Sequence, residues 1–193
     1  HIWCNIRLHT EIQVKFNVAS HYSYSFYGKK LIENDFLKYA YASKIDSLKL
    51  DIKDSFYLYD EDNFKFAHID AEELPEFSFD FFLPQLNEML KKRDFKLMVK
   101  TADNYETTND IFINGEKVKL YTQQDVHNLK FWDTASRNFF KKVNQLLKTK
   151  NINEQFYLVN AGNDLKTLLL TDKQFSIISE YYKDNEQEKP YKP

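Results

Sequence analysis

Hydrophobic and polar residues alternate along much of the first part of the chain. Between residues 2 and 18 the apolar side chains fall mostly on even positions, which is the period-two pattern of a half-buried strand or of a hairpin. Residues 22–26 and 48–52 repeat this alternation, while residues 31–47 fit a short helix. We therefore expect residues 1–75 to be mainly β and to form an antiparallel sheet.

A turn-forming tetrad lies in the second half of this region. Asp60-Glu61-Asp62-Asn63 separates two short aromatic-rich runs, residues 56–59 and 64–69. Because Asp and Asn side chains bond readily to nearby backbone groups, the pattern predicts a hairpin with the tetrad at its tip. The oxygens of the tetrad would also suit a calcium ion, but the glycine and the distant glutamate of an EF-hand are missing. A plain solvated hairpin tip is therefore the favoured interpretation.

From residue 76 onward the pattern changes to helices followed by strands. Apolar residues recur at three- and four-residue spacing in residues 82–90 and again in residues 139–147, and basic residues follow both runs. Asn114-Gly115 predicts a tight hairpin turn, and Thr171 is expected to begin a last helix. The expected strands are residues 95–101, 110–113, 117–121, 156–160 and 166–170.

These elements predict one α+β domain over residues 1–183. It would consist of an N-terminal antiparallel sheet, two helix-strand-strand units and a C-terminal helix. Residues 82–93 can be aligned with residues 139–150 at a constant shift, so residues 76–183 are a candidate internal repeat. Residues 184–193 are polar and end in proline, which predicts a flexible tail.

Composition and charge narrow the class of protein. The formal net charge is −2 and the isoelectric point is near 6.2, which argues against a nucleic-acid-binding protein. The longest apolar runs are far shorter than the roughly 20 residues that cross a bilayer, so no membrane partner is expected. The single cysteine, Cys4, lies on the apolar phase of the first strand. It excludes an internal disulfide and favours a cytoplasmic protein with a buried thiol.

Few residue patterns point to catalysis or to a cofactor. The three glycines are isolated, so neither common phosphate-binding loop is present, and the common zinc and serine-hydrolase signatures are missing. His68 and Asp70 would share one face of a strand and are a candidate metal site or proton relay. We expect no cofactor, no metal and no catalytic residue, and keep as an alternative a metal-assisted hydrolase that uses Asp60, Asp62 or His68.

Acidic residues are concentrated in one segment. Between residues 60 and 80 there are eight acidic residues and a single base, Lys65. The tyrosines that precede this segment either form a contact surface, since tyrosine is enriched at protein interfaces, or fill and edge a sheet. The acidic segment itself is either a binding surface or a solvated loop.

The C-terminal part of the chain resembles a known class of proteins. Residues 156–164 (FYLVNAGND) and 170–178 (LTDKQFSII) are similar to segments of small bacterial immunity proteins, which neutralise polymorphic toxins. That class contains unrelated folds, so no functional residue is carried over from it.

The resemblance implies a non-enzymatic protein that binds a protein partner, for example a basic toxin domain. A nuclease toxin must hold phosphate and is basic, so an acidic surface would complement it and speed association. A structural or assembly subunit that pairs through its sheet edges is a further alternative. On the immunity hypothesis the residues expected to contact the partner are Tyr57, Tyr59, Asp60, Glu61, Asp62, Glu72, Glu73 and Glu76.

Overall fold

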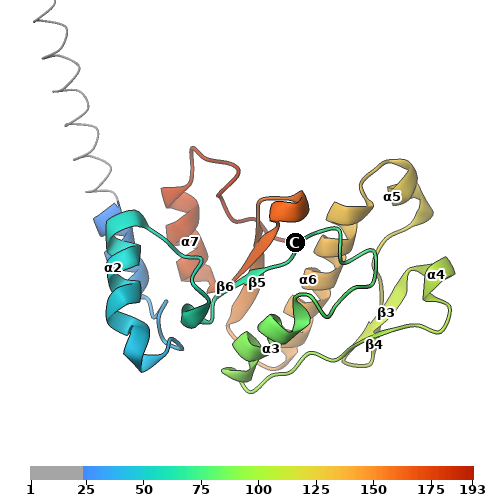
Figure 1. The fold of residues 1–193 in the computed structure, drawn as a ribbon, viewed down its shortest axis with the longest axis horizontal. Helices are drawn as coiled ribbons and strands as arrows, with labels where there is room; N and C mark the ends of the chain where they lie inside the picture. The colour runs from blue at the N-terminus through green and yellow to red at the C-terminus, as the bar shows by residue number, and fades with distance from the viewer. Residues whose placement is uncertain (1–23) are drawn as a thin grey trace, which may run out of the picture.

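The structure is a computed structural model that describes residues 24–193 (Figure 1). It mixes helices and strands, which confirms the α+β class. The strand or hairpin expected over residues 2–18, together with Cys4, lies outside the described residues. None of the helices within residues 24–193 is both long and apolar enough to cross a membrane.

One antiparallel sheet is buried on both faces. Its strands lie in the order β1 (Phe66–His68), β6 (Lys166–Thr171), β5 (Glu154–Val159). Along β5 the side chains of Phe156 and Leu158 enter one hydrophobic core, and those of Tyr157 and Val159 enter another. Burial on both faces explains why β5 and β6 have nearly continuous apolar runs.

The structure has a second antiparallel sheet of three strands. Its strands lie in the order β2 (Val99–Thr101), β3 (Asp110–Ile113), β4 (Glu116–Lys119). Asn114 and Gly115 join β3 to β4, and both have positive φ angles, as the predicted tight turn requires.

Helices separate and cover the two sheets (Figure 1). A helix over residues 24–33, α2 (Ile45–Ser55) and α7 (Asp172–Tyr181) cover one face of the first sheet. Between its other face and the second sheet lie α3 (Leu83–Lys91) and α6 (Phe131–Thr149). The shorter helical segments are η1 (Ala42–Lys44), η2 (Glu61–Asn63), α4 (Tyr105–Thr108), α5 (Gln123–His127) and η3 (Gly162–Asp164).

The prediction that residues 1–75 are mainly β is wrong for the part that the structure describes. Residues 24–33 and 45–55 are helical, and β1 is the only strand between residues 24 and 75. Leu48, Leu50 and Ile52 alternate with polar residues, which suggested a strand. In the helix, Leu48 and Ile52 lie one turn apart and are buried, while Leu50 is 59% exposed.

The predicted hairpin around the acidic tetrad does not form. Asp60 instead caps the single turn η2 by accepting a hydrogen bond from the Asp62 N–H, at 2.8 Å. The Asn63 side chain is buried and donates to the Leu58 carbonyl. β1 then pairs with β6, about a hundred residues away, rather than with residues 56–59. Such long-range pairing has no local signal in the sequence.

The two predicted helix-strand-strand units fare differently. The second is confirmed, because α6 is followed by β5 and β6 and then by α7. In the first unit α3 is followed by all three strands of the second sheet. Each of them matches an expected strand, so the helix-strand-strand description of this unit was one strand short.

The C-terminal segment is docked, contrary to the predicted flexible tail. Tyr191 forms an antiparallel bridge with Leu158, and the Asn160 N–H donates to the Gln187 carbonyl. Pro190 is buried. The segment thus covers the edge of β5, which is the edge strand of the first sheet.

A buried ion cluster joins β5 to the regions before β1 and after α3. Both Lys65 and Arg93 bond to the Glu154 carboxylate, with Arg93 Nε at 2.6 Å from Glu154 Oε2. Burial lowers the pKa of Lys65 to about 8, although Glu154 opposes that shift. Burial alone would raise the pKa of Glu154, but Arg93 and Lys65 lower it below its ordinary value. This cluster ties distant segments together beneath the sheet.

Candidate protein-binding site

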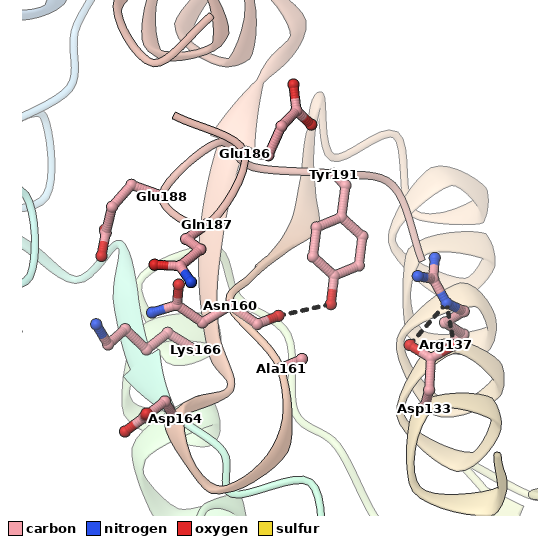
Figure 2. Close-up of a pocket in the computed structure, with 10 residues that line it drawn as sticks. All are labelled: Asp133, Arg137, Asn160, Ala161, Asp164, Lys166, Glu186, Gln187, Glu188 and Tyr191. Atoms are coloured by element: carbon pink, nitrogen blue, oxygen red, sulfur yellow. Dashed lines mark hydrogen bonds and ion pairs between the residues drawn. The ribbon is translucent and has the colours of Figure 1, made fainter. Parts of the chain in front are cut away.

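A polar hollow of about 750 Å³ lies between α6, the turn that joins β5 to β6, and the C-terminal segment (Figure 2). Three parts of the chain far apart in sequence therefore build one site. Their lining residues are Asp133 and Arg137 from α6, Asn160, Ala161, Asp164 and Lys166 from the turn and the start of β6, and Glu186, Gln187, Glu188 and Tyr191 from the C-terminal segment.

Tyr191 and Arg137 fix one wall of this hollow. The Tyr191 backbone exchanges two hydrogen bonds with Leu158, at 2.9 and 2.8 Å, and its hydroxyl donates to the Asn160 carbonyl at 2.8 Å. The Arg137 guanidinium lies 4.8 Å from the centre of the Tyr191 ring and binds Asp133 at 2.8 Å (Figure 2). The C-terminal segment is thus a structural part of the site.

A second hollow of about 360 Å³ adjoins the first. Leu129, Trp132 and Leu165 line much of it, and Glu72 stands at its border. The two hollows share lining residues, and together they are here called the binding depression. The shared residues are Asp133, Ala161 and Tyr191.

The loop formed by residues 70–81 borders the binding depression. The Ala71 N–H donates to the Gly162 carbonyl at 3.0 Å, and the Tyr121 hydroxyl donates to the Pro75 carbonyl at 3.1 Å. Phe77 has a left-handed backbone, and its ring packs 4.7 Å from that of Tyr105. These contacts fix the backbone, so the loop presents its carboxylates from a defined position.

Two large apolar side chains are exposed next to these carboxylates. Phe81 is 53% exposed and packs edge-on against the His68 ring, whose Nε2 lies 3.0 Å from the Asn163 carbonyl oxygen. Leu129 is 73% exposed at the border of the depression. The site therefore combines a polar border with apolar points of contact, which is the arrangement of protein interfaces.

Negative charge exceeds positive charge in the binding depression. Five carboxylates line it, from Glu72, Asp133, Asp164, Glu186 and Glu188, against three cations, from Lys130, Arg137 and Lys166. Two of the carboxylates are in ion pairs, Asp133 with Arg137 and Glu186 with Lys189 at 3.1 Å. The adjoining loop adds the exposed side chains of Glu76 and Asp80. We call this surface, with the depression and loop 70–81, the acidic face.

The two tyrosines expected to anchor a partner differ in position. Tyr57 is 48% exposed, and its hydroxyl donates to the Tyr59 carbonyl. Tyr59 is partly buried and donates its hydroxyl to Glu188 at 2.5 Å, beneath the Lys166 side chain. Burial and the bond to Glu188 raise the pKa of Tyr59. Tyr59 therefore supports the C-terminal segment, while Tyr57 remains open to solvent.

The acidic tetrad and the later glutamates occupy separate surroundings. Asp62 pairs with Lys44 at 3.2 Å, and Asp60 is engaged as the cap of η2, which leaves Glu61 as the exposed carboxylate. Glu72 and Glu76 are exposed and Glu73 is partly buried on loop 70–81. No residue of the tetrad lines the binding depression, whereas Glu72 does.

His68 and Asp70, the candidate relay pair, do not bond to each other. The His68 ring faces the Asn163 carbonyl, while the Asp70 carboxylate accepts from the Glu72 N–H at 3.1 Å. Within residues 24–193 no group of three or more His, Cys, Asp or Glu side chains could hold a metal ion. The cofactor prediction itself stays a prediction.

Sequence reasoning missed the residues contributed by α6 and by the C-terminal segment. Asp133 and Arg137 are four residues apart on one helix, a spacing that was available as a signal of an ion pair. Leu129 and Tyr191 carried no comparable signal, because their importance depends on contacts made across the fold.

Comparison with protein-family models, curated proteins and solved structures found no match for this chain.

Proposed function

We propose that this protein binds and inhibits a basic protein partner through the acidic face, as an immunity protein does for a bacterial toxin in the cytoplasm. The observation that carries the proposal is the excess of carboxylates around the binding depression, with Leu129 exposed at its border and Phe81 exposed on the adjoining loop 70–81. Carboxylates surrounding apolar contact points suit a partner whose own site is basic.

The physical argument has two parts. Complementary charge steers encounter and raises the association rate, and it excludes partners of the same sign. Apolar side chains that are desolvated on binding contribute most of the affinity. A face that carries both kinds of group on a fixed backbone can therefore bind fast and hold its partner.

The fixed backbone also matters for inhibition. Loop 70–81 is held at Ala71 and at Pro75, and the opposite wall is held by Tyr191. Little ordering entropy is then lost on binding, so more of the interaction free energy appears as affinity.

The test is a neutralisation assay in which each gene flanking this one is expressed and screened for a toxin domain that stops growth. We expect co-expression of the protein to restore growth of cells that produce this domain. The double variant Glu72→Lys/Glu76→Lys should fail to restore growth at matched protein levels. The double variant Asp51→Lys/Asp54→Lys, with the same charge change on α2, should restore it. Equal rescue by both double variants, or no rescue by the natural protein, would contradict the proposal.

A further inference from the structure

Leu129 has a backbone conformation that favours glycine. The residue follows α5 with φ at 55°, in the left-handed region. Its N–H donates to the Val126 carbonyl at 3.1 Å, and the next N–H, of Lys130, donates to the Asp125 carbonyl at 2.9 Å. This pair of bonds is the Schellman motif, in which the left-handed position is usually glycine and sometimes asparagine.

The other non-glycine residues with positive φ in the described part of the chain are explained by their own chemistry. Seven are Asp or Asn, which tolerate the left-handed region because their short polar side chains bond locally. Three are phenylalanines, Phe56, Phe64 and Phe77, whose rings are buried or packed against a core. Packing of these rings offsets the backbone strain.

Leu129 has neither explanation. It is a large apolar residue in a strained backbone conformation, and 73% of it is exposed. Both features are unfavourable for the isolated protein, and asparagine or glycine would avoid both. Because a leucine at this position does not stabilise the fold, we infer that it has a role in binding.

Leu129 stands where an anchor for the partner is expected. It borders the binding depression together with Trp132 and Glu72, while Lys130 follows it in the chain. The Schellman turn fixes the backbone that carries the side chain, so little backbone entropy is lost when the side chain is buried. A desolvated apolar side chain inside a polar rim is the usual form of an interface hot spot.

We propose that Leu129 is the apolar anchor of the acidic face and inserts into an apolar socket bordered by lysine or arginine on the basic partner. This inference rests on the proposed function, since it names the residue through which the same face gains affinity. It further implies that position 129 was selected for binding at the expense of stability.

The experiment compares Leu129→Gly and Leu129→Asn with the natural protein. We expect both variants to keep their thermal unfolding midpoint to within about 3 °C or to raise it, because relief of strain offsets the loss of a mostly exposed side chain. Their Kd for the purified toxin domain identified by the neutralisation assay should rise by roughly 30-fold or more. Leu50→Ala, which truncates a leucine on α2 that is 59% exposed, should leave that Kd unchanged.

The possible outcomes separate the anchor from the wider proposal. Unchanged affinity in the Leu129 variants, with weaker binding by Glu72→Lys/Glu76→Lys, would overturn the anchor and leave the acidic face in place. No binding of the toxin domain by the natural protein would overturn both. Weaker binding that accompanies a large loss of thermal stability in both Leu129 variants would assign the residue to the fold and overturn the anchor.

Discussion

Asn87 on α3 and Asn144 on α6 make the same pair of hydrogen bonds to backbone. Asn87 accepts from the Leu97 N–H at 2.8 Å and donates to the Leu97 carbonyl at 3.1 Å. Asn144 does the same to Phe156, at 2.7 and 2.9 Å. In each case an asparagine on a helix bonds to both the N–H and the carbonyl of one residue in the extended segment that follows the helix.

This pair supports the predicted internal repeat. Asn87 and Asn144 occupy equivalent positions when residues 82–93 are aligned with residues 139–150. The first residues of the two segments, Phe82 and Phe139, pack against each other with ring centres 5.7 Å apart. A shared side-chain role at an aligned position is stronger support than the amphipathic pattern alone, because the pattern recurs in unrelated helices.

Truncation of either asparagine is expected to destabilise the fold by a similar amount. Asn87→Ala and Asn144→Ala each leave a backbone N–H and a backbone carbonyl without partners, which costs about 1–3 kcal/mol. Chemical denaturation of both variants measures this change in the free energy of unfolding. Asn153→Ala, at an exposed asparagine, serves as the control. A negligible effect at either position would show that the shared bonds do not support the fold.

The buried ion cluster predicts a pH-dependent effect of Glu154→Gln. At pH 7 this change leaves Lys65 and Arg93 buried without their carboxylate, which should lower the free energy of unfolding by about 3–5 kcal/mol. Because the pKa of Glu154 is lowered in the folded protein, its contribution is present above the unfolded value near 4.3 and is lost as the pH falls through the folded value.

The measurement is denaturant unfolding of both proteins at pH 7 and at steps below pH 4. The gap between the natural protein and Glu154→Gln should narrow towards acid. Glu88→Gln, at an exposed position on α3, should show no such gap. A gap that stays constant with pH would argue against a charged Glu154 in the folded protein.

Removal of residues 184–193 should destabilise the protein and promote self-association. The deletion removes three backbone hydrogen bonds to Leu158 and Asn160, each worth about 1 kcal/mol, and it exposes the edge of β5 to other chains. Denaturation and light scattering after size-exclusion chromatography measure the two effects. Deletion of Pro193 alone is the control. A truncated protein with natural stability and mass would contradict the docked segment.

The fold was only partly predictable from sequence, and the reason differs among elements. α6, α7, β5 and β6 were predicted because apolar spacing and turn residues are local signals, as is the Thr171 cap that begins α7. α2 was missed because Leu48, Leu50 and Ile52 alternate as in a strand, whereas only Leu48 and Ile52 share one helical face. The partner of β1 was missed because β6 lies about a hundred residues away.

The candidate site was also predictable only where local sequence signals define it. Glu72 and Glu76 were recognised from local charge, and the structure exposes both on a fixed loop. Tyr59 was expected at the surface, but its hydroxyl bonds to Glu188, a contact 129 positions away that no local pattern encodes. Leu129 became notable only through its φ angle and its exposure.

The central claim is that the acidic face binds a basic protein, and the association rate tests it most directly. The rate constant would be measured by stopped flow against the toxin domain identified by the neutralisation assay, over a series of salt concentrations. We predict that salt slows association of the natural protein, and that Glu72→Lys/Glu76→Lys lowers the rate by about tenfold or more at low salt and weakens its salt dependence. Asp51→Lys/Asp54→Lys should behave almost as the natural protein does. Equal rates and equal salt dependence in the two double variants would contradict the claim.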